Sequence, residues 1–128
     1  MEAMSGSSDE AIDRLLVGNA VADSAPFRSW LIGNFIPPEL GLRSTRDVEV
    51  KWGVHARGET RSDWGTSPHA VTLSLLLRGV IRIFFEDNRE VLLKQEGDYA
   101  MWSQGVGHRW AVEADETVVV TVRWPSAA

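Results

Sequence analysis

Residues Gly97 to Val112, GDYAMWSQGVGHRWAV, contain the pattern that decides the fold. The stretch begins with a Gly-Asp turn, continues as an apolar strand over Tyr99–Trp102, and turns again at a glycine-rich corner around Gly105. Glycine at a corner can adopt positive φ and allows close backbone approach, so the chain can reverse direction there. His108 and Trp110 then share one face of a second strand, because strand side chains alternate with a period of two. The stretch therefore predicts two short strands joined by a tight turn.

The composition is that of one globular domain. The chain has 128 residues, 44% of them hydrophobic and 24% charged, and this length can bury one substantial core. Its formal net charge is −5 and its positive charges are scattered, whereas nucleic-acid binding calls for a clustered basic face. No apolar run approaches the roughly 20 residues of a membrane helix, and the N-terminus lacks a signal-peptide pattern. We therefore expect a cytoplasmic protein with no nucleic-acid and no membrane partner.

The chain contains no cysteine. This composition excludes disulfide bonds, catalysis by a thiolate and metal sites with sulfur ligands. Any metal ligands must therefore come from histidine and carboxylate side chains.

The segment from Asp47 to Arg57 alternates clearly between apolar and polar residues. Val48, Val50, Trp52 and Val54 fall on one face, and Glu49, Lys51, Gly53 and His55 fall on the other. Strict alternation is typical of a β-strand with two different faces. A polar face that carries His55 beside Lys51 and Glu49 indicates that this face lines a cavity.

The remaining strands are short and separated by turn residues. Strand patterns cover residues 27–36, 69–78, 80–86, 89–95 and 117–124, whereas residues 39–46 and 58–68 are polar and indicate loops. No segment with a helical period lies between the strands, which argues against a parallel α/β sheet. We therefore expect an all-β fold, an antiparallel β-sandwich or jelly-roll barrel of about eight or nine strands.

Residues 1–24 are expected to form an N-terminal arm, and residues 25–128 a single barrel domain. The arm is either partly disordered or forms a short helix over Glu10–Val17, with Ser8 or Asp9 as its cap. The strand pattern at residues 27–36 has no obvious partner in the meander that follows. An exposed apolar strand tends to be covered by another chain, so we expect a homodimer.

The spacing of Gly97, Gly105 and His108 resembles the second motif of the cupin family. That motif is a glycine, five residues, Pro-x-Gly, two residues and a histidine; here Ser103 stands at the proline position, and Val112 stands where asparagine is common. The resemblance implies a cupin barrel with a cavity at its mouth. It also makes His108 a candidate metal ligand.

The first cupin motif, Gly-x5-His-x-His, three or four residues, Glu, six residues and Gly, is incomplete. If Gly79 ends it, the glutamate position falls on Thr72, and arginine follows in His55-Ala56-Arg57 where the second histidine is expected. In an alternative register His55 is the second histidine and Glu59 follows after three residues. We favour the first register for the fold.

The resemblance implies a divalent metal held by His55 and His108, with Glu59 or His69 as the third ligand. Two histidines and one carboxylate suit Fe(II), and Mn, Ni or Zn are alternatives. In the other interpretation the two histidines only form hydrogen bonds inside a polar cavity. The candidate ligand-binding residues are those expected near the cavity, namely Lys51, Arg57, Arg61, Thr72 and Trp110. The basic residues would orient a carboxylate or phosphate, and Trp110 would stack on the ligand.

Two main functions follow from these features. The first is a small metal-dependent cupin enzyme that acts on a small organic substrate. The second is a non-catalytic binding module that captures a small molecule in the same cavity without metal. A third hypothesis is a metal-free isomerase or epimerase with His55 or His108 as the base. The fold does not choose among them, because many activities share it.

Overall fold

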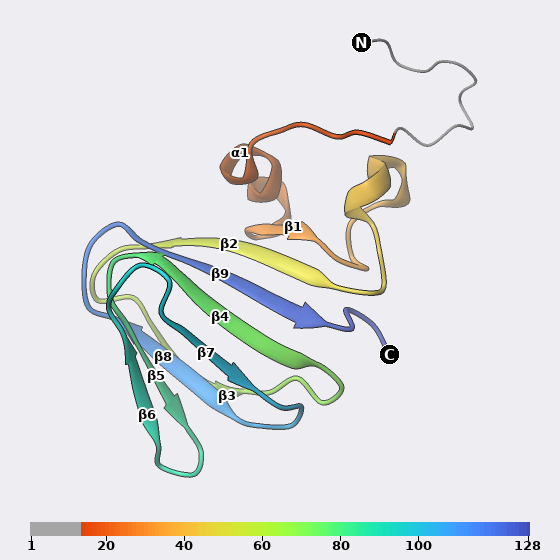
Figure 1. Ribbon diagram of the computed structural model, residues 1–128. Helices are drawn as coiled ribbons and strands as arrows, with labels where there is room; N and C mark the ends of the chain where they lie inside the picture. Colours follow the sequence, from red (N-terminus) through yellow and green to blue (C-terminus); the bar gives the residue numbers. More distant parts are fainter. Residues whose placement is uncertain (1–13) are drawn as a thin grey trace.

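The computed structural model describes residues 14–128, which form a barrel of two antiparallel sheets (Figure 1). The elements in chain order are α1 (Ala20–Ser24), the 3-10 helix η1 (Ala25–Phe27), β1 (Trp30–Ile32), the 3-10 helix η2 (Pro38–Arg43), β2 (Glu49–His55), β3 (Thr60–Gly65), β4 (Val71–Arg78), β5 (Ile81–Phe85), β6 (Glu90–Leu93), β7 (Tyr99–Trp102), β8 (His108–Val112) and β9 (Thr117–Trp124). One sheet has the order β1-β2-β9-β4-β7, and the other has the order β3-β8-β5-β6. The predicted all-β antiparallel architecture is confirmed.

The apolar core fills the space between the two sheets near the β4–β5 and β8–β9 hairpins. Leu76 and Val119 are register partners on β4 and β9, and Ile81 and Val112 are register partners on β5 and β8. These side chains form one buried cluster with Ile83, Phe85, Leu93 and Trp102. Burial of this apolar surface is the main source of the stability of the fold.

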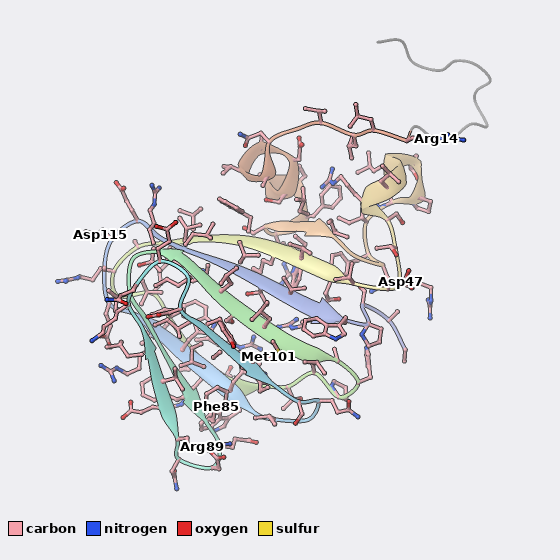
Figure 2. The ribbon with its side chains drawn as sticks, viewed as in Figure 1. Arg14, Asp47, Phe85, Arg89, Met101 and Asp115 are labelled. Atoms are coloured by element: carbon pink, nitrogen blue, oxygen red, sulfur yellow. The ribbon has the colours of Figure 1, made fainter. Side chains whose placement is uncertain are left out.

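The predicted alternation along β2 is also confirmed. Lys51, Gly53 and His55 face the interior of the barrel, where they line a cavity. Val54 lies on the other face, and about half of it is exposed to solvent. In Figure 2 the labels Asp47 and Asp115 mark the two opposite ends of the barrel. β2 begins near the Asp47 end and finishes near the Asp115 end, because its last residue is the register partner of Thr117.

Residues 58–68, which we expected to form a loop, contain strand β3. Thr60 and Arg61 are register partners of Ala111 and Trp110 on β8, so β3 lies at the edge of the four-stranded sheet. The first five residues of β3 are exposed. A polar edge strand buries no apolar face and shows little alternation. The sequence pattern therefore gave no sign of it.

The N-terminal part differs from expectation in two ways. The strand expected over residues 27–36 is only β1, and it pairs with β2, so it does have a partner within the chain. Half of the expected helix Glu10–Val17 lies outside the described residues, and Leu15–Val17 are not helical. The helix that does form is α1, where the side chain of Asn19 accepts a hydrogen bond from the backbone N–H of Ala22 at 3.1 Å. Over residues 14–128, no helix has the length and apolar character needed to cross a membrane.

Candidate functional site

A cavity lies between the two sheets, and its lining is mostly polar. The lining residues are Lys51, Gly53, His55, Arg61, Thr72, Ser74, Ile81, Ile83, Trp102, His108, Trp110, Val119, Thr121 and Arg123. Three of them are cationic, two are histidines, and none is a carboxylate. Strands β2, β4, β7 and β9 supply the wall from the large sheet, and β3, β5 and β8 supply the opposite wall.

Three buried side chains and one partly buried side chain meet at the end of the cavity where β9 finishes and β8 begins. Thr72 on β4 is the register partner of both Trp102 on β7 and Arg123 on β9, so these three inward side chains lie at one level of the sheet. The ring of His108 lies 4.8 Å from the ring of Trp102, centroid to centroid. We call this group, Thr72, Trp102, His108 and Arg123, the polar cluster.

Each residue of the polar cluster carries a buried polar atom without a hydrogen-bond partner. These atoms are Thr72 Oγ1, Trp102 Nε1, His108 Nδ1 and Arg123 Nε. Thr72 is 1% exposed, His108 5% and Trp102 9%. Buried polar atoms in native proteins are almost always paired, so four unpaired atoms in one place indicate a site that receives polar partners from a ligand or water.

Positive charge gathers around the same end of the cavity. Burial lowers the pKa of the Lys51 ammonium, and the nearby charges of Arg123, Arg61 and Arg28 lower it further. The indole ring of Trp30 contacts the two cavity cations that lie on the large sheet. Lys51 Nζ lies 5.6 Å and Arg123 Cζ 5.3 Å from the centroid of the ring. Cation–π contact of this kind stabilises like charges held side by side.

In the described part of the chain, Arg123 is the one cation of the cavity that has a carboxylate partner at hydrogen-bond distance. Its Nη1 donates to Glu49 Oε2 at 3.2 Å, and the Ser126 hydroxyl donates to Glu49 Oε1 at 2.9 Å. The backbone N–H of Asn34 donates to the oxygen of the same serine hydroxyl at 2.9 Å. This chain of contacts holds the guanidinium at the end of the cavity where β9 finishes.

The surroundings of His108 favour its neutral form. Burial lowers the pKa of its imidazole, and the charges of Arg123 and Arg61 act in the same direction, whereas the Val106 carbonyl opposes them. A neutral imidazole carries one N–H donor and one acceptor nitrogen. His108 can therefore offer a hydrogen bond to a ligand without adding to the positive charge of the cavity.

His55 lies on the wall opposite His108, and the carboxylate of Glu59 orients its ring. Its Nδ1 lies 2.8 Å from Glu59 Oε1, and the pKa of Glu59 is lowered by a backbone hydrogen bond from Ala56 and by the contact with His55. Because an ionised carboxylate only accepts hydrogen bonds, Nδ1 carries the proton. The other nitrogen, Nε2, lies above Gly53, where a Cβ would come within 2.7 Å of it. The imidazole also packs against Trp110, with 4.9 Å between the ring centroids.

The structure places six of the sequence-derived site residues on the cavity wall and three outside it. Those on the wall are His55, His108, Lys51, Arg61, Thr72 and Trp110. Glu59 is exposed at the rim, and His69 is exposed in the segment before β4. Arg57 is also exposed; its backbone N–H donates to Asp115 Oδ1, and its side chain donates to the Glu113 carbonyl. Arg57 therefore does not line the cavity.

The donors near His108 do not form a metal site. Within residues 14–128 there is no group of three or more histidine or carboxylate side chains that could hold an ion. The register partners of His108 are Gly65 on β3 and Phe85 on β5, and neither can ligate a metal. A divalent ion in a cupin-like site needs about three protein ligands and no adjacent excess of positive charge. The residues present do not fit a resident divalent metal.

Several residues that line the cavity were not predicted from the sequence. Arg123, Trp102, Ser74 and Thr121 line the cavity, yet the sequence analysis placed none of them there. The alternation Val119, Thr121, Arg123 along β9 was a usable signal, because a strand that buries one face does not place arginine there without a reason. Glu49 and Trp30 could not be linked to Arg123 from sequence, since they lie on other strands.

Solved structures with the same arrangement of strands identify the class of fold. The chain is similar to KdgF from Halomonas sp. (15% identity, TM-score 0.57, covering 63% of this chain and 72% of that one). It is also similar to a cupin superfamily protein from Desulfitobacterium hafniense DCB-2 (21%, 0.56, 63% and 70%). A third is an uncharacterized conserved protein with a double-stranded beta-helix domain from Klebsiella pneumoniae (22%, 0.58, 66% and 68%). No protein-family model and no curated protein matches the sequence. The chain therefore has the cupin fold, as the spacing of Gly97, Gly105 and His108 predicts.

Proposed function

We propose that the chain binds a small organic ligand in the barrel cavity through its own side chains, without a resident metal ion. The observation that carries this proposal is the cavity lining, which has three cations, two histidines and three hydroxyl groups but no carboxylate. Polar groups inside a barrel cost free energy unless they are hydrogen-bonded. A small polar ligand supplies those bonds, whereas a positively charged wall disfavours a divalent cation.

Metal analysis of the protein tests this proposal against the metalloenzyme hypothesis. After soaking with Fe(II), Mn(II), Ni(II) or Zn(II) and dialysis, we expect much less than one ion per chain by elemental mass spectrometry. We also expect members of a small-molecule fragment set to shift the indole N–H signals of Trp102 and Trp110, which line the cavity. One retained ion per chain that is lost in His108→Ala but kept in His69→Ala would contradict the proposal.

A second candidate function is a metal-free isomerase, and the contact between His55 and Glu59 favours it. Because Glu59 fixes the proton on Nδ1, the lone pair is on Nε2, and that nitrogen lies on the cavity side above Gly53. A base in this position could remove a proton from a bound ligand and return it. His55→Gln separates the two candidates, because it should abolish turnover of an isomerised ligand while leaving its binding largely intact.

We also propose that the protein is a cytoplasmic homodimer, paired through the outer face of the five-stranded sheet. Apolar residues form continuous rows across this face: Val50, Val122, Leu73 and Met101 in one row, and Trp52, Val120, Leu75 and Tyr99 in the next. Tyr99 is 61% and Met101 52% exposed. A contiguous apolar face of this kind usually marks a protein interface. The absence of cysteine is in keeping with a reducing compartment.

Glutamate substitutions test this interface. The double variant Val54→Glu/Met101→Glu should halve the mass measured by light scattering, because buried charges at an apolar interface are strongly unfavourable. Leu42→Glu is the matched control, since Leu42 has the same exposed fraction as Met101, 52%, but lies on η2. A monomeric parent at micromolar concentration, or a double variant that still dimerises, would contradict this assignment.

A further inference from the structure

We propose that the polar cluster, together with Lys51, is a subsite for the carboxylate group of a small organic acid. The inference rests on the proposed function and specifies the chemical class of its ligand. It goes further because it assigns the anchoring group to one end of the cavity and to named donor atoms. The positive charge that a metal would provide in a cupin-like site is provided here by side chains.

The side chains of the subsite come from five strands, β2, β4, β7, β8 and β9. Thr72, Trp102 and Arg123 are held at one level by backbone pairing of β4 with β7 and β9, and the tilted ring of His108 packs against Trp102. The Trp102 indole N–H and the Arg123 Nε–H are obligate donors, and the Thr72 hydroxyl can donate. A planar carboxylate accepts up to about four hydrogen bonds, so it can satisfy several of these unpaired atoms together.

The charge balance favours an anion at this position. Arg123 is paired with Glu49, but Lys51 has no carboxylate partner among residues 14–128 and lies near Arg123 and Arg61. Three cations with one nearby carboxylate leave a formal excess of two positive charges (3 − 1 = 2). An anionic group between them would offset the repulsion, which adds to the larger effect of burial in lowering the pKa of Lys51. The free protein therefore gains favourable electrostatic energy from a bound carboxylate.

The remainder of the cavity indicates an organic acid rather than an inorganic anion. Apolar parts of the cavity lining are formed by Ile81, Ile83, Val119 and the ring of Trp110. An inorganic phosphate would leave these surfaces without contact, whereas the hydrocarbon part of an organic acid would cover them. A short, compact acid with one carboxylate therefore fits both the polar and the apolar parts of the lining.

Butyrate and butyramide form a matched pair of probes, because they share a shape and differ in charge. Proton–nitrogen NMR spectra report on Trp102 directly through its indole N–H, which is assigned with the Trp102→Phe variant. We expect butyrate to shift this signal saturably and at least about tenfold more tightly than butyramide, as expected for one charge-assisted hydrogen bond. Inorganic phosphate at the same concentration should shift it less than butyrate.

Two variants and one control identify the residues involved. Lys51→Met should weaken butyrate binding about tenfold and should fold well, because it removes a buried charge that has no carboxylate partner. Thr72→Val keeps the shape of the side chain and should weaken binding by a smaller factor. Arg89→Gln should leave binding unchanged, since Arg89 is exposed and paired with Asp87 outside the cavity.

The possible results separate this inference from the proposed function. Equal binding of butyrate and butyramide, or unchanged butyrate binding in Lys51→Met, would overturn the carboxylate subsite while leaving small-molecule binding in place. Tighter binding of phosphate than of butyrate would overturn the choice of an organic acid. No binding of either organic probe, together with one tightly held metal ion per chain, would overturn the proposed function as well.

Discussion

Replacing Gly79 by alanine is expected to lower the free energy of unfolding by about 2–4 kcal/mol. Gly79 joins β4 to β5 with φ of +95°, a conformation that a residue with a Cβ adopts only under strain. A Cβ at this position would also lie 2.5 Å from the backbone Cα of Thr117. Thr117 is fully buried, and its hydroxyl bonds to the Ala114 carbonyl and accepts from the Val80 N–H. It therefore cannot move aside without breaking those bonds.

Gly97→Ala is the control that separates the cost of backbone strain from the cost of the clash with Thr117. Gly97 has nearly the same φ, +93°, but a Cβ there would meet nothing within 4 Å. Gly97→Ala should therefore lower the free energy of unfolding only through backbone strain, by about 1 kcal/mol. Urea denaturation followed by tryptophan fluorescence measures both variants. Equal losses would show that the contact with Thr117 contributes nothing.

The sequence predicted the barrel because its turn residues and its alternating strands both indicate short antiparallel strands. The Gly97 turn, the glycine corner around Gly105 and the alternation from Val48 to His55 are local patterns, and each is directly visible in the chain. Gly79 likewise lies between two strand patterns, so the sequence also predicts a turn at that position. Local consistency of this kind is what allows a fold class to be deduced from one sequence.

The site was harder to predict because its residues come together only through the pairing of distant strands. His55 and His108 do line one cavity, but neither Glu59, which of the two contacts only His55, nor His69 forms a group of three possible metal ligands with them within residues 14–128. Counting residues between motif positions could not show that β3, not β2, runs beside the strand of His108. The contact of Arg123 with Glu49 joins residues 74 positions apart, so no local pattern reports it.

Replacing Glu49 by glutamine is expected to lower the free energy of unfolding by about 2–3 kcal/mol. The change keeps the size of the side chain and one oxygen that can accept from Ser126, but it leaves the Arg123 guanidinium in a largely buried position without a counterion. The side chains of Glu49 and Arg123 are only 11% and 21% exposed, so solvent screens this charge poorly. Removal of one partner from such a pair is costly because the other charge stays desolvated.

Glu59→Gln is the matched control, since it makes the same chemical change at a pair with His55 whose carboxylate is 48% exposed. Exposed pairs contribute about 1 kcal/mol or less, so its midpoint of urea denaturation should move little. The carboxylate subsite adds a second expectation: butyrate should raise the denaturation midpoint of Glu49→Gln more than that of the parent. The reason is that the ligand then supplies the counterion that Arg123 has lost. A ligand that binds the native state more tightly stabilises that state more. If the two glutamine variants are equally stable, Glu49 is not the counterion that holds Arg123 in the cavity.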